Sequence, residues 1–492
     1  MKKIKEIYNR IKTQGIQSED SPFECQFYGY DVTPLPKEAY YIFNGHTPNI
    51  ITRPKNADEV SFILSNATAT GIPVTPRGGG TAGYFQAVPR KRGILIETLA
   101  INSIGKVNPE TSTVTVGSGA IWLDIEWELK KQGYCLKTYP TSYRSSTVAG
   151  WMQTEGAGVG SLMYGNIRKL VSRIEAVLPT GEIITLKKGD GVKSGKGTIS
   201  FDDFFKSEGM YGLITQVDLE VRKIPQSVST HLLMFKDNAH FSKYATTLET
   251  MQGIYFVEFV NGAFLDLLKI GKFHAPQHTE ENVSAVIRFE GDDATVKAGV
   301  AALKAMVAAD ASIKELDTHE AEEEYAERLD YFRIKCAFPS VTPADIQVPT
   351  TSLGKMLEKC SKFRFKMAYK GELLGGNNCG IMYFMVLGNE LSIVKFMSTA
   401  PYQMEIIFNA IRLGGGPNGG IGMLNTPYIY GLKTYNERMN FVDKKEELDP
   451  AWIMNPGKWP DPPFYLRPYI YFSGMKCLEP VCAIVGGIRR RW

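Results

Sequence analysis

A run of three glycines is the feature of this sequence with the clearest chemistry. Within residues 73–83, Arg77 precedes Gly78-Gly79-Gly80 and Thr81 follows them. Glycine accepts a positive φ and lets a ligand approach the backbone closely. Successive amides in such a loop point into one concavity and hold an anion. We therefore predict a phosphate- or pyrophosphate-binding loop; the alternative is a tight turn between two strands.

Hydroxyl side chains form a second cluster, within residues 139–150. Thr141, Ser142, Ser145 and Ser146 can donate hydrogen bonds to phosphate oxygens or to ring heteroatoms, although a polar turn would also use them. The glycine run at residues 156–160 lacks both the preceding apolar strand and the spacing of a Rossmann turn. We therefore predict that NAD does not bind there.

Alternating strands and helices must position the two clusters. A predicted helix and a short apolar strand lead directly into the glycines. Runs of β-branched residues bounded by Gly, Asn or Pro indicate further strands. Gly133 ends the amphipathic helix expected at residues 121–132. The expected helices are residues 58–70 and 121–132, and the expected strands are residues 72–75, 94–98, 112–117 and 174–178.

The second half of the chain repeats this alternation loosely after a Lys- and Gly-rich stretch, residues 187–197, which we expect to be a mobile loop. Strands interspersed with helices indicate a second α/β or α+β domain. The expected strands are residues 231–235, 253–260, 283–289 and 380–386, and the expected helices are residues 241–251, 293–309, 318–331, 353–363 and 389–412.

Composition narrows the class of protein. A chain of 492 residues predicts two or three domains. A net charge of +4 and the lack of a basic stripe argue against nucleic-acid binding. The N-terminus lacks the apolar core of a signal peptide and no run of about 18 apolar residues occurs. The seven scattered cysteines form no Cys-x-x-Cys pair, so we expect a cytoplasmic protein without an iron–sulfur cluster or structural zinc of its own.

Six segments, in order along the chain, resemble the FAD-linked oxidase family, which has the fold of vanillyl-alcohol oxidase. The resemblance is strongest to the branch of the glycolate oxidase flavoprotein subunit and D-lactate dehydrogenase, and it covers nearly the whole chain. The segments are residues 48–60, 76–81, 139–150, 163–165, 207–215 and 449–458.

The resemblance implies an α+β fold. A two-subdomain PCMH-type FAD-binding domain would be followed by an α+β substrate (cap) domain, and a C-terminal segment would return to the FAD-binding domain. The corresponding divisions are an N-terminal helix and arm at 1–47, the FAD-binding domain at 48–225, the cap domain at 226–412, and the returning segment with an aromatic and basic tail at 413–492.

The resemblance also implies FAD as the cofactor. The amides of the glycine loop and Arg77 suit a pyrophosphate, and later glycines would let the backbone lie against the isoalloxazine. Some relatives tether the flavin through a histidine near this loop, but residues 77–86 contain none, so we predict non-covalent FAD. The predicted cofactor-binding residues are Pro76, Arg77, Gly78, Gly79, Gly80, Thr81, Ala82, Pro140, Thr141, Ser142, Ser145, Ser146, Gly150, Gly156, Tyr164, Gly165, Gly212, Ile214, Asn455 and Lys458.

Members of this branch are expected to oxidise a 2-hydroxy acid to a 2-oxo acid, with a base taking the hydroxyl proton while hydride passes to the flavin. Arg333 lies where the branch places an arginine for the substrate carboxylate, and a guanidinium fork fits a carboxylate. The alternative is a surface arginine on a helix.

The histidine motifs that bind a metal and supply the base in many relatives are absent. The corresponding residues, 368–380 and 414–422, contain no histidine, and all six histidines precede residue 320. We predict no metal site. Tyr369 and Tyr428 are the predicted catalytic tyrosines. Other candidates for the base are Lys370, Glu372 and the pair His274 and His278.

Three functions remain open. The first is dehydrogenation of a 2-hydroxy acid with electrons passed to a partner protein. The second is oxidation of a phenol or aromatic alcohol, with tyrosine and arginine stabilising a phenolate. The third is a non-catalytic flavoprotein subunit of an electron-transfer complex. The aromatic residues 464–475 and Arg489–Trp492 would dock an iron–sulfur or other electron-acceptor subunit, touch an anionic membrane surface, or pack onto the FAD domain. A homodimer is also compatible with the sequence.

Overall fold

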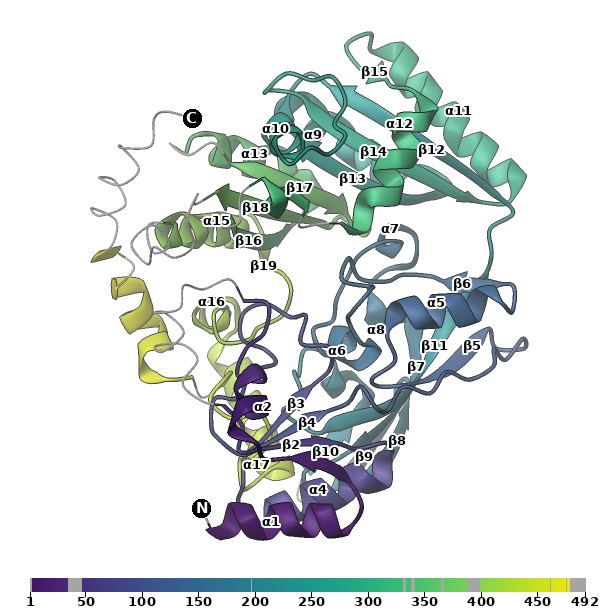
Figure 1. The fold of residues 1–492 in the computed structure, drawn as a ribbon. Helices are drawn as coiled ribbons and strands as arrows, with labels where there is room; N and C mark the ends of the chain where they lie inside the picture. Colours follow the sequence, from purple (N-terminus) through teal and green to yellow (C-terminus); the bar gives the residue numbers. More distant parts are fainter. Residues whose placement is uncertain are drawn as a thin grey trace.

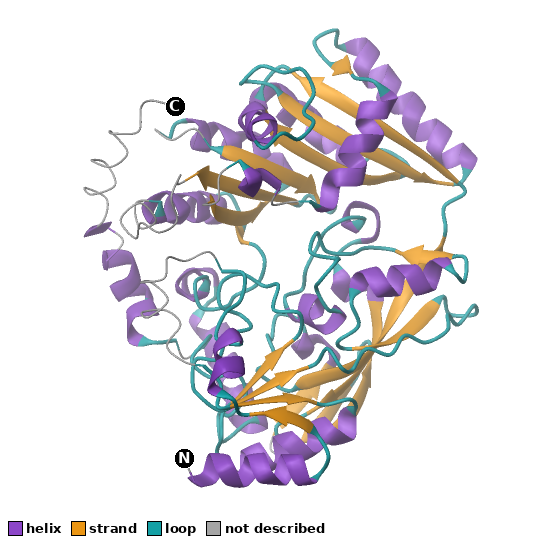
Figure 2. Ribbon diagram, in the orientation of Figure 1, coloured by secondary structure: helices purple, strands orange, loops and turns teal. Residues whose placement is uncertain are grey.

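The computed structural model describes residues 2–33, 47–195, 197–330, 333–337, 341–363, 367–386, 399–460, 462–474 and 476–477. Two sheets and a two-stranded hairpin from residues 17–223 lie together, and one eight-stranded sheet from residues 227–417 lies above them in Figure 1. Helices and strands are mixed throughout both halves, as Figure 2 shows. The predicted α+β class is confirmed.

The first sheet carries the glycine loop. Its strand order is β1-β2-β4-β3, with β2, β4 and β3 parallel. Helix α4 (Ala57–Thr70) begins at Asn56, whose side chain accepts a hydrogen bond from the Glu59 amide, and ends at Gly71 with φ 66°. Its apolar stripe and that of α1 (Lys2–Thr13) pack on the sheet. The strands are β1 (Gln17–Glu19), β2 (Ile50–Arg53), β3 (Val74–Arg77) and β4 (Ile94–Glu97).

The second sheet is antiparallel and is built around the long strand β11 (Leu213–Lys223), which pairs with β5, β6 and β7. Helix α5 (Trp122–Lys130) buries Trp122, Ile125 and Leu129 against it. The predictions of the helix at 121–132 and of the strands at 112–117 and 174–178 are therefore confirmed to within a few residues. The other strands are β5 (Thr113–Gly117), β6 (Tyr134–Leu136), β7 (Val171–Val177) and β8 (Ile183–Lys187).

The prediction of a mobile loop at residues 187–197 is wrong. The segment contains β9 (Gly191–Ser194), which pairs with β10 (Gly197–Ser200) as an antiparallel hairpin. Val192 packs against the core and Ile199 is buried. One apolar residue on each strand therefore fixes a segment whose lysines and glycines resemble those of a loop.

The third sheet has eight strands in the order β15-β12-β14-β13-β17-β18-β16-β19. Helices α9 (Asn238–Glu249), α11 (Asp293–Ala309), α13 (Leu353–Ser361) and α15 (Ala400–Arg412) contact its strands or one another, and their apolar residues share one core with it. Part of the helix predicted at 389–412 lies outside the described residues. The strands are β12 (Ser227–Phe235), β13 (Ile254–Asn261), β14 (Val283–Gly291), β15 (Lys314–Glu315), β16 (Val341–Val348), β17 (Ala368–Leu373), β18 (Cys379–Val386) and β19 (Gly416–Pro417).

The end of the chain returns to the first sheet. After α17 (Tyr435–Leu448), the Val74 amide donates to the Ile453 carbonyl at 2.7 Å, and the Asn455 amide donates to the Val74 carbonyl at 2.7 Å. This contact lies at the start of β3, the strand that leads into the glycine loop. The predicted C-terminal return is confirmed.

Candidate active site

The glycine loop follows β3 and lies against the hydroxyl-rich segment. A Cβ on Gly78 would stand 2.2 Å from Thr147 Oγ1, and one on Gly79 would stand 2.1 Å from the Ser145 carbonyl oxygen. Both distances are far shorter than a van der Waals contact. The close approach of the Thr147 side chain at Gly78 and of the Ser145 backbone at Gly79 therefore requires glycine at both positions, and it places the two predicted clusters side by side.

The hydroxyl-rich segment is held by tight turns. The Ser145 amide donates to the Ser142 carbonyl at 3.0 Å, and Thr147 Oγ1 accepts from the Gly150 amide at 3.3 Å at the start of α6 (Val148–Gln153). Ser146 is buried, and its Oγ has no hydrogen-bond partner among the described residues. A buried hydroxyl without a partner is costly, so this atom fits a hydrogen bond to a bound ligand.

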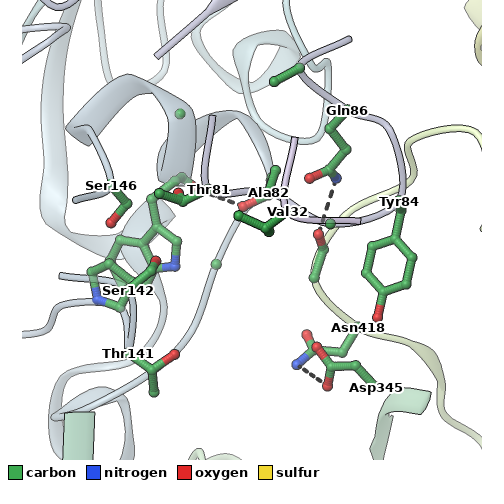
Figure 3. Close-up of a pocket in the computed structure, with 18 of the residues that line it drawn as sticks. Val32, Thr81, Ala82, Tyr84, Gln86, Thr141, Ser142, Ser146, Asp345 and Asn418 are labelled. Carbon is green, nitrogen blue, oxygen red and sulfur yellow. Dashed lines mark hydrogen bonds between the residues drawn. The ribbon is translucent and has the colours of Figure 1, made fainter. Parts of the chain in front are cut away.

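A cavity of about 1030 Å³ runs from these clusters to the large sheet. Its size reaches the upper end of the roughly 300–1000 Å³ of small-molecule sites. Figure 3 shows Ser142 and Ser146 at one part of its wall and Tyr84, Asp345 and Asn418 at another. The predicted cofactor residues that line it are Pro76, Arg77, Gly78, Gly79, Gly80, Thr81, Ala82, Pro140, Thr141, Ser142, Ser145, Ser146, Gly150, Gly156, Gly212 and Ile214.

Arg77 lines this cavity but is already bound to the protein. Its Nη1 donates to the carbonyls of Tyr30 and Ala87, at 2.7 and 3.3 Å, and its guanidinium lies 5.3 Å from the centre of the Tyr28 ring. Burial lowers the pKa of Arg77, but an arginine stays charged. The side chain therefore supplies fixed positive charge near the glycine loop, as an anion site requires.

Four predicted cofactor residues do not line the cavity. The Tyr164 ring stacks with the Arg222 guanidinium at 5.4 Å, and Gly165 ends a short helix with φ 80°. Asn455 Nδ2 donates to the Glu208 carbonyl at 2.7 Å, and Lys458 Nζ donates to the Gln86 carbonyl. Asn455 and Lys458 therefore support residues that line the cavity instead of lining it themselves.

Glu208 is the centre of this support, and sequence reasoning did not select it. Its carboxylate accepts from Gln86 Nε2 at 2.7 Å and from the amides of Ile421 and Gly422 at 2.6 and 2.9 Å. Burial raises the pKa of Glu208 and lowers the pKa of Lys458 to about 8. The network ties the glycine loop, the loop at 416–422 and the returning C-terminus together around one wall of the cavity.

Arg333, the predicted carboxylate-binding residue, lines the cavity but is paired with two glutamates. Its Nη2 donates to Glu324 Oε2 at 3.1 Å, and its Nη1 forms an ion pair with Glu327. The arginine and Glu324 are both buried. A carboxylate ligand would therefore compete with two glutamates for this guanidinium.

The two predicted catalytic tyrosines are placed differently. Tyr428, on α16 (Thr426–Leu432), lines the cavity beside Tyr471 and Phe472, and burial raises its pKa well above the usual range. Tyr369 does not line the cavity. It packs in the core of the large sheet, and its hydroxyl donates to Asn238 Oδ1 at 2.6 Å, so its placement does not support a role at the reacting centre.

Strand alternation explains the position of Tyr369. Successive side chains of a strand point to opposite faces of the sheet. Glu372 pairs across with Gly380, and Met382 pairs with Lys370 and with Asp345. These residues share the face that borders the cavity, whereas Tyr369 lies one residue out of phase. Lys370 is buried on that face in an ion pair with Glu258 at 2.8 Å.

Two carboxyls on this face line the cavity, Asp345 and Glu372. Burial raises the pKa of Asp345 to about 7, and burial together with Glu258 raises the pKa of Glu372 to about 8. Carboxyls with perturbed pKa values in a cavity are typical of functional sites. Asp345 was missed, although Asp345 and Gln347 alternate with apolar residues in the sequence and so indicated a polar strand face.

The histidine pair is away from the cavity. His278 is bound to Asp266 and to the Pro276 carbonyl, at 3.1 and 2.8 Å, and the half-exposed His274 lies 3.9 Å from Glu324. Neither lines the cavity. Across the described residues, no group of three or more His, Cys, Asp and Glu side chains could hold a metal ion. Among the same residues, no helix is long and apolar enough to cross a bilayer.

Two family models match adjoining parts of the chain. The FAD binding domain model covers residues 48–187, which contain the glycine loop, and the model of the C-terminal domain of FAD linked oxidases covers residues 224–459, which contain Arg333, Asp345 and Glu372. The fold and cavity thus define an FAD-dependent oxidoreductase. The chain belongs to the FAD-linked oxidase family.

Relatives of nearly full length place it near one branch. The glycolate oxidase subunit GlcD of Bacillus subtilis (strain 168) is 25% identical over 466 residues, 91% of this chain and 95% of that protein. The D-lactate dehydrogenase of Anaerostipes hadrus is 24% identical over 439 residues, 85% of this chain and 90% of that protein. The predicted branch of glycolate oxidase and D-lactate dehydrogenase is confirmed at low identity.

Solved structures confirm the fold. A p-cresol methylhydroxylase with substrate bound has a TM-score of 0.76 at 13% identity, covering 93% of this chain and 96% of that one. A 4-ethylphenol oxidase from Gulosibacter chungangensis has a TM-score of 0.74 at 15% identity, covering 95% and 98%. The PCMH-type arrangement of FAD-binding and cap domains is therefore confirmed.

Proposed function

We propose that this protein dehydrogenates a 2-hydroxy acid to a 2-oxo acid and passes the electrons to a partner protein. The similarity to GlcD and D-lactate dehydrogenase over most of the chain supports this reaction. The cavity supports an enzyme over a non-catalytic subunit, because it extends from the glycine loop to the polar face of the large sheet and is not filled by side chains.

The residues present fit FAD. The cradle between Gly78, Gly79 and residues 145–147 leaves no room for a side chain, and Ser146 Oγ lacks a protein partner within the described chain. The amides of the glycine loop and Arg77 would hold the pyrophosphate, and Thr141, Ser142 and Ser146 would donate to the cofactor. When bound, FAD supplies a two-electron acceptor for hydride.

The protein's own task is to bind the substrate, exclude water and move one proton. Arg333, which lines the cavity together with Lys335, would bind a substrate carboxylate in exchange for Glu324 or Glu327. Such an exchange retains charge-assisted hydrogen bonds on the guanidinium. Apolar side chains such as Leu374, Met382 and Ile407 form the wall around it.

A second candidate is oxidation of an uncharged aromatic alcohol or phenol. It is favoured by two observations in the same cavity: Arg333 is paired with two glutamates, and Asp345 and Glu372 have raised pKa values. Neutral carboxyls and a paired arginine would accept a hydroxyl more readily than a free carboxylate.

An anaerobic titration of the holoenzyme separates the candidates. D- and L-2-hydroxy acids and aromatic alcohols are added in turn while the flavin absorption band is followed. Bleaching by hydroxy acids supports the first reaction, and bleaching by aromatic alcohols alone supports the second. A flavin that only dithionite reduces would contradict both and would leave the electron-transfer subunit.

The electron acceptor has a separate test. Phe464 and Tyr469 of the C-terminal segment are exposed, and a partner subunit could bind there; residues 478–492 of the predicted docking tail lie outside the described residues. Truncation after Pro463 should leave flavin bound and should abolish co-purification of an iron–sulfur subunit. Unchanged co-purification would contradict docking through this segment.

A further inference from the structure

One oxygen of the Asp345 carboxyl is fixed by a chain of amides. Asn418 Nδ2 donates to Asp345 Oδ1 at 3.2 Å, and Gln347 Nε2 donates to Asn418 Oδ1 at 2.5 Å. Asn378 Nδ2 in turn donates to Gln347 Oε1 at 3.3 Å. Because each amide oxygen is occupied as an acceptor, the nitrogen of Asn418 must face Asp345.

This arrangement decides where a proton can reside. Oδ1 receives an N–H whether or not the carboxyl is ionised, so a proton on Asp345 must sit on Oδ2. Oδ2 lies beside Gly419, where a Cβ would stand 3.1 Å away. The backbone N–H of Asn418 also donates to the backbone carbonyl of Asp345 at 3.0 Å. This bond fixes the loop that carries Asn418 against strand β16. Because Gly419 has no Cβ, the space beside Oδ2 stays open, and both residues line the cavity. Figure 3 shows the Asp345–Asn418 hydrogen bond that occupies the other carboxyl oxygen.

Few titratable groups face this carboxyl. The buried Tyr84 hydroxyl, which is hydrogen-bonded to the Asp345 backbone, approaches from the glycine-loop side, and Glu372 approaches from β17. Strand β18 contributes Gly380 and Met382 to the cavity wall. Helix α15 contributes Ala400, Gln403 and Ile407, none of which titrates.

We propose that Asp345 is the catalytic residue that accepts the proton of the substrate hydroxyl, and that Asn418 and Gln347 are positioning residues that keep its Oδ2 directed into the cavity. This assignment rests on the proposed function. It gives the site a base where the chain has no histidine motif, and it uses a residue that lines the same cavity as Arg333.

The proton and electron balance is complete with the proposed reaction. Dehydrogenation of an alcohol removes one proton and one hydride. The O–H proton would pass to Asp345 Oδ2, and the C–O bond would become a carbonyl. Bound FAD would supply the two-electron acceptor for the hydride that leaves the carbon. The proton then leaves Asp345 for solvent before the next turnover.

The pH dependence has a definite sign. Burial raises the pKa of Asp345 to about 7, and only the ionised carboxylate can accept a proton. Reduction of the flavin by substrate should therefore increase as pH rises through about 7 and then level off. The Asn418 hydrogen bond favours the ionised form, so its loss should move this midpoint to higher pH.

The test uses the holoenzyme with glycolate, D-lactate and benzyl alcohol, and measures the rate of anaerobic flavin reduction against pH. We expect Asp345→Asn to bind FAD and to be reduced by dithionite, but to lose on the order of 10²–10⁴-fold in reduction by substrate. Asn418→Ala should shift the pH midpoint upward, a change that a purely structural role would not cause. Asp330→Asn is the matched control, since Asp330 also lines the cavity but is half-exposed and paired with Arg144 at 2.7 Å.

Each result decides between defined alternatives. If substrate reduces the wild-type flavin and the rate for Asp345→Asn is within a few-fold of the wild-type rate, the assignment of Asp345 is overturned. The proposed function then stays intact. If neither these substrates nor the wider panel of D- and L-2-hydroxy acids reduces the wild-type flavin, the proposed function fails. A measurement without substrate then decides whether Asp345 holds the proton. If the oxidised flavin spectrum of the wild type changes near pH 7 and that of Asp345→Asn does not, Asp345 Oδ2 remains the proton-accepting atom. If the wild-type spectrum shows no such change, the assignment is overturned.

Discussion

Arg333 Nη2 donates to Glu324 Oε2 at 3.1 Å, and both side chains are buried beside the cavity. The arginine that was expected to bind a substrate carboxylate is thus supplied with a carboxylate by the protein itself. Removing one partner of a buried charge pair leaves the other uncompensated. This pair therefore gives a direct way to ask whether the substrate carries a negative charge.

Arg333→Gln should raise KM for a 2-hydroxy acid by roughly 10–100-fold, since a hydrogen bond to a charged group contributes about 1.5–3 kcal/mol. KM for an uncharged alcohol should change little. Glu324→Gln should lower KM for the hydroxy acid, because one competing carboxylate is removed. Steady-state kinetics on both substrate classes checks this, and equal effects on both classes would argue against a carboxylate clamp.

Gly79→Ala should abolish FAD retention. Its Cβ would lie 2.1 Å from the backbone oxygen of Ser145, so no side-chain rotation relieves the clash and the two cradle segments must separate. Gly83→Ala is the control in the same loop, since no atom lies within 4 Å of its Cβ. The ratio of flavin to protein absorbance after gel filtration measures the outcome. Equal flavin content in the two variants would show that the cradle does not require close approach.

The FAD should be released completely on acid precipitation. Residues 77–86 contain no histidine, and the two histidines considered near the flavin do not line the cavity. The flavin absorbance of the supernatant is compared with that of the native holoenzyme. Flavin that remains in the protein pellet would contradict a non-covalent cofactor.

Asp449→Ala should destabilise the returning C-terminus by about 3–5 kcal/mol. Asp449 binds Lys445 Nζ at 2.6 Å and accepts from the amides of Ile453 and Met454, and both charged side chains are buried. Burial lowers the pKa of Lys445, which shows the cost of leaving its charge unpaired.

The control for Asp449 is Glu358→Ala. Glu358 and Lys362 form an i,i+4 pair at 2.7 Å with the same spacing, but both are exposed, so removing the pair should leave the unfolding midpoint nearly unchanged. Urea unfolding followed by tryptophan fluorescence compares the two variants. Equal losses would mean that the buried pair does not anchor the segment.

Short segments of the sequence were enough to predict much of the fold and the residues expected at the cofactor site. Helix α4 has its cap, its apolar stripe and its terminal glycine within 16 residues, and its limits were predicted closely. The glycine loop and the hydroxyl cluster were selected because glycine and hydroxyl groups have few other uses at such density. The residue types of these two segments alone indicated an anion-binding site, without knowledge of their tertiary contacts.

The face of the large sheet that carries Asp345 and Glu372 into the cavity depended on tertiary pairing. Tyr369 and Glu372 lie in the same short strand, and only the register of β17 with β18 puts Glu372 at the cavity and Tyr369 in the core. Asp345 acquires its properties from Asn418, 73 residues away, and from burial under Tyr84. Burial and distant hydrogen bonds set the charge state of a carboxyl, and no local pattern records them. Local sequence patterns therefore indicated the cofactor class and the elements around its site. Which side chains face the cavity was decided by the tertiary structure, because strand register and long-range contacts select the face.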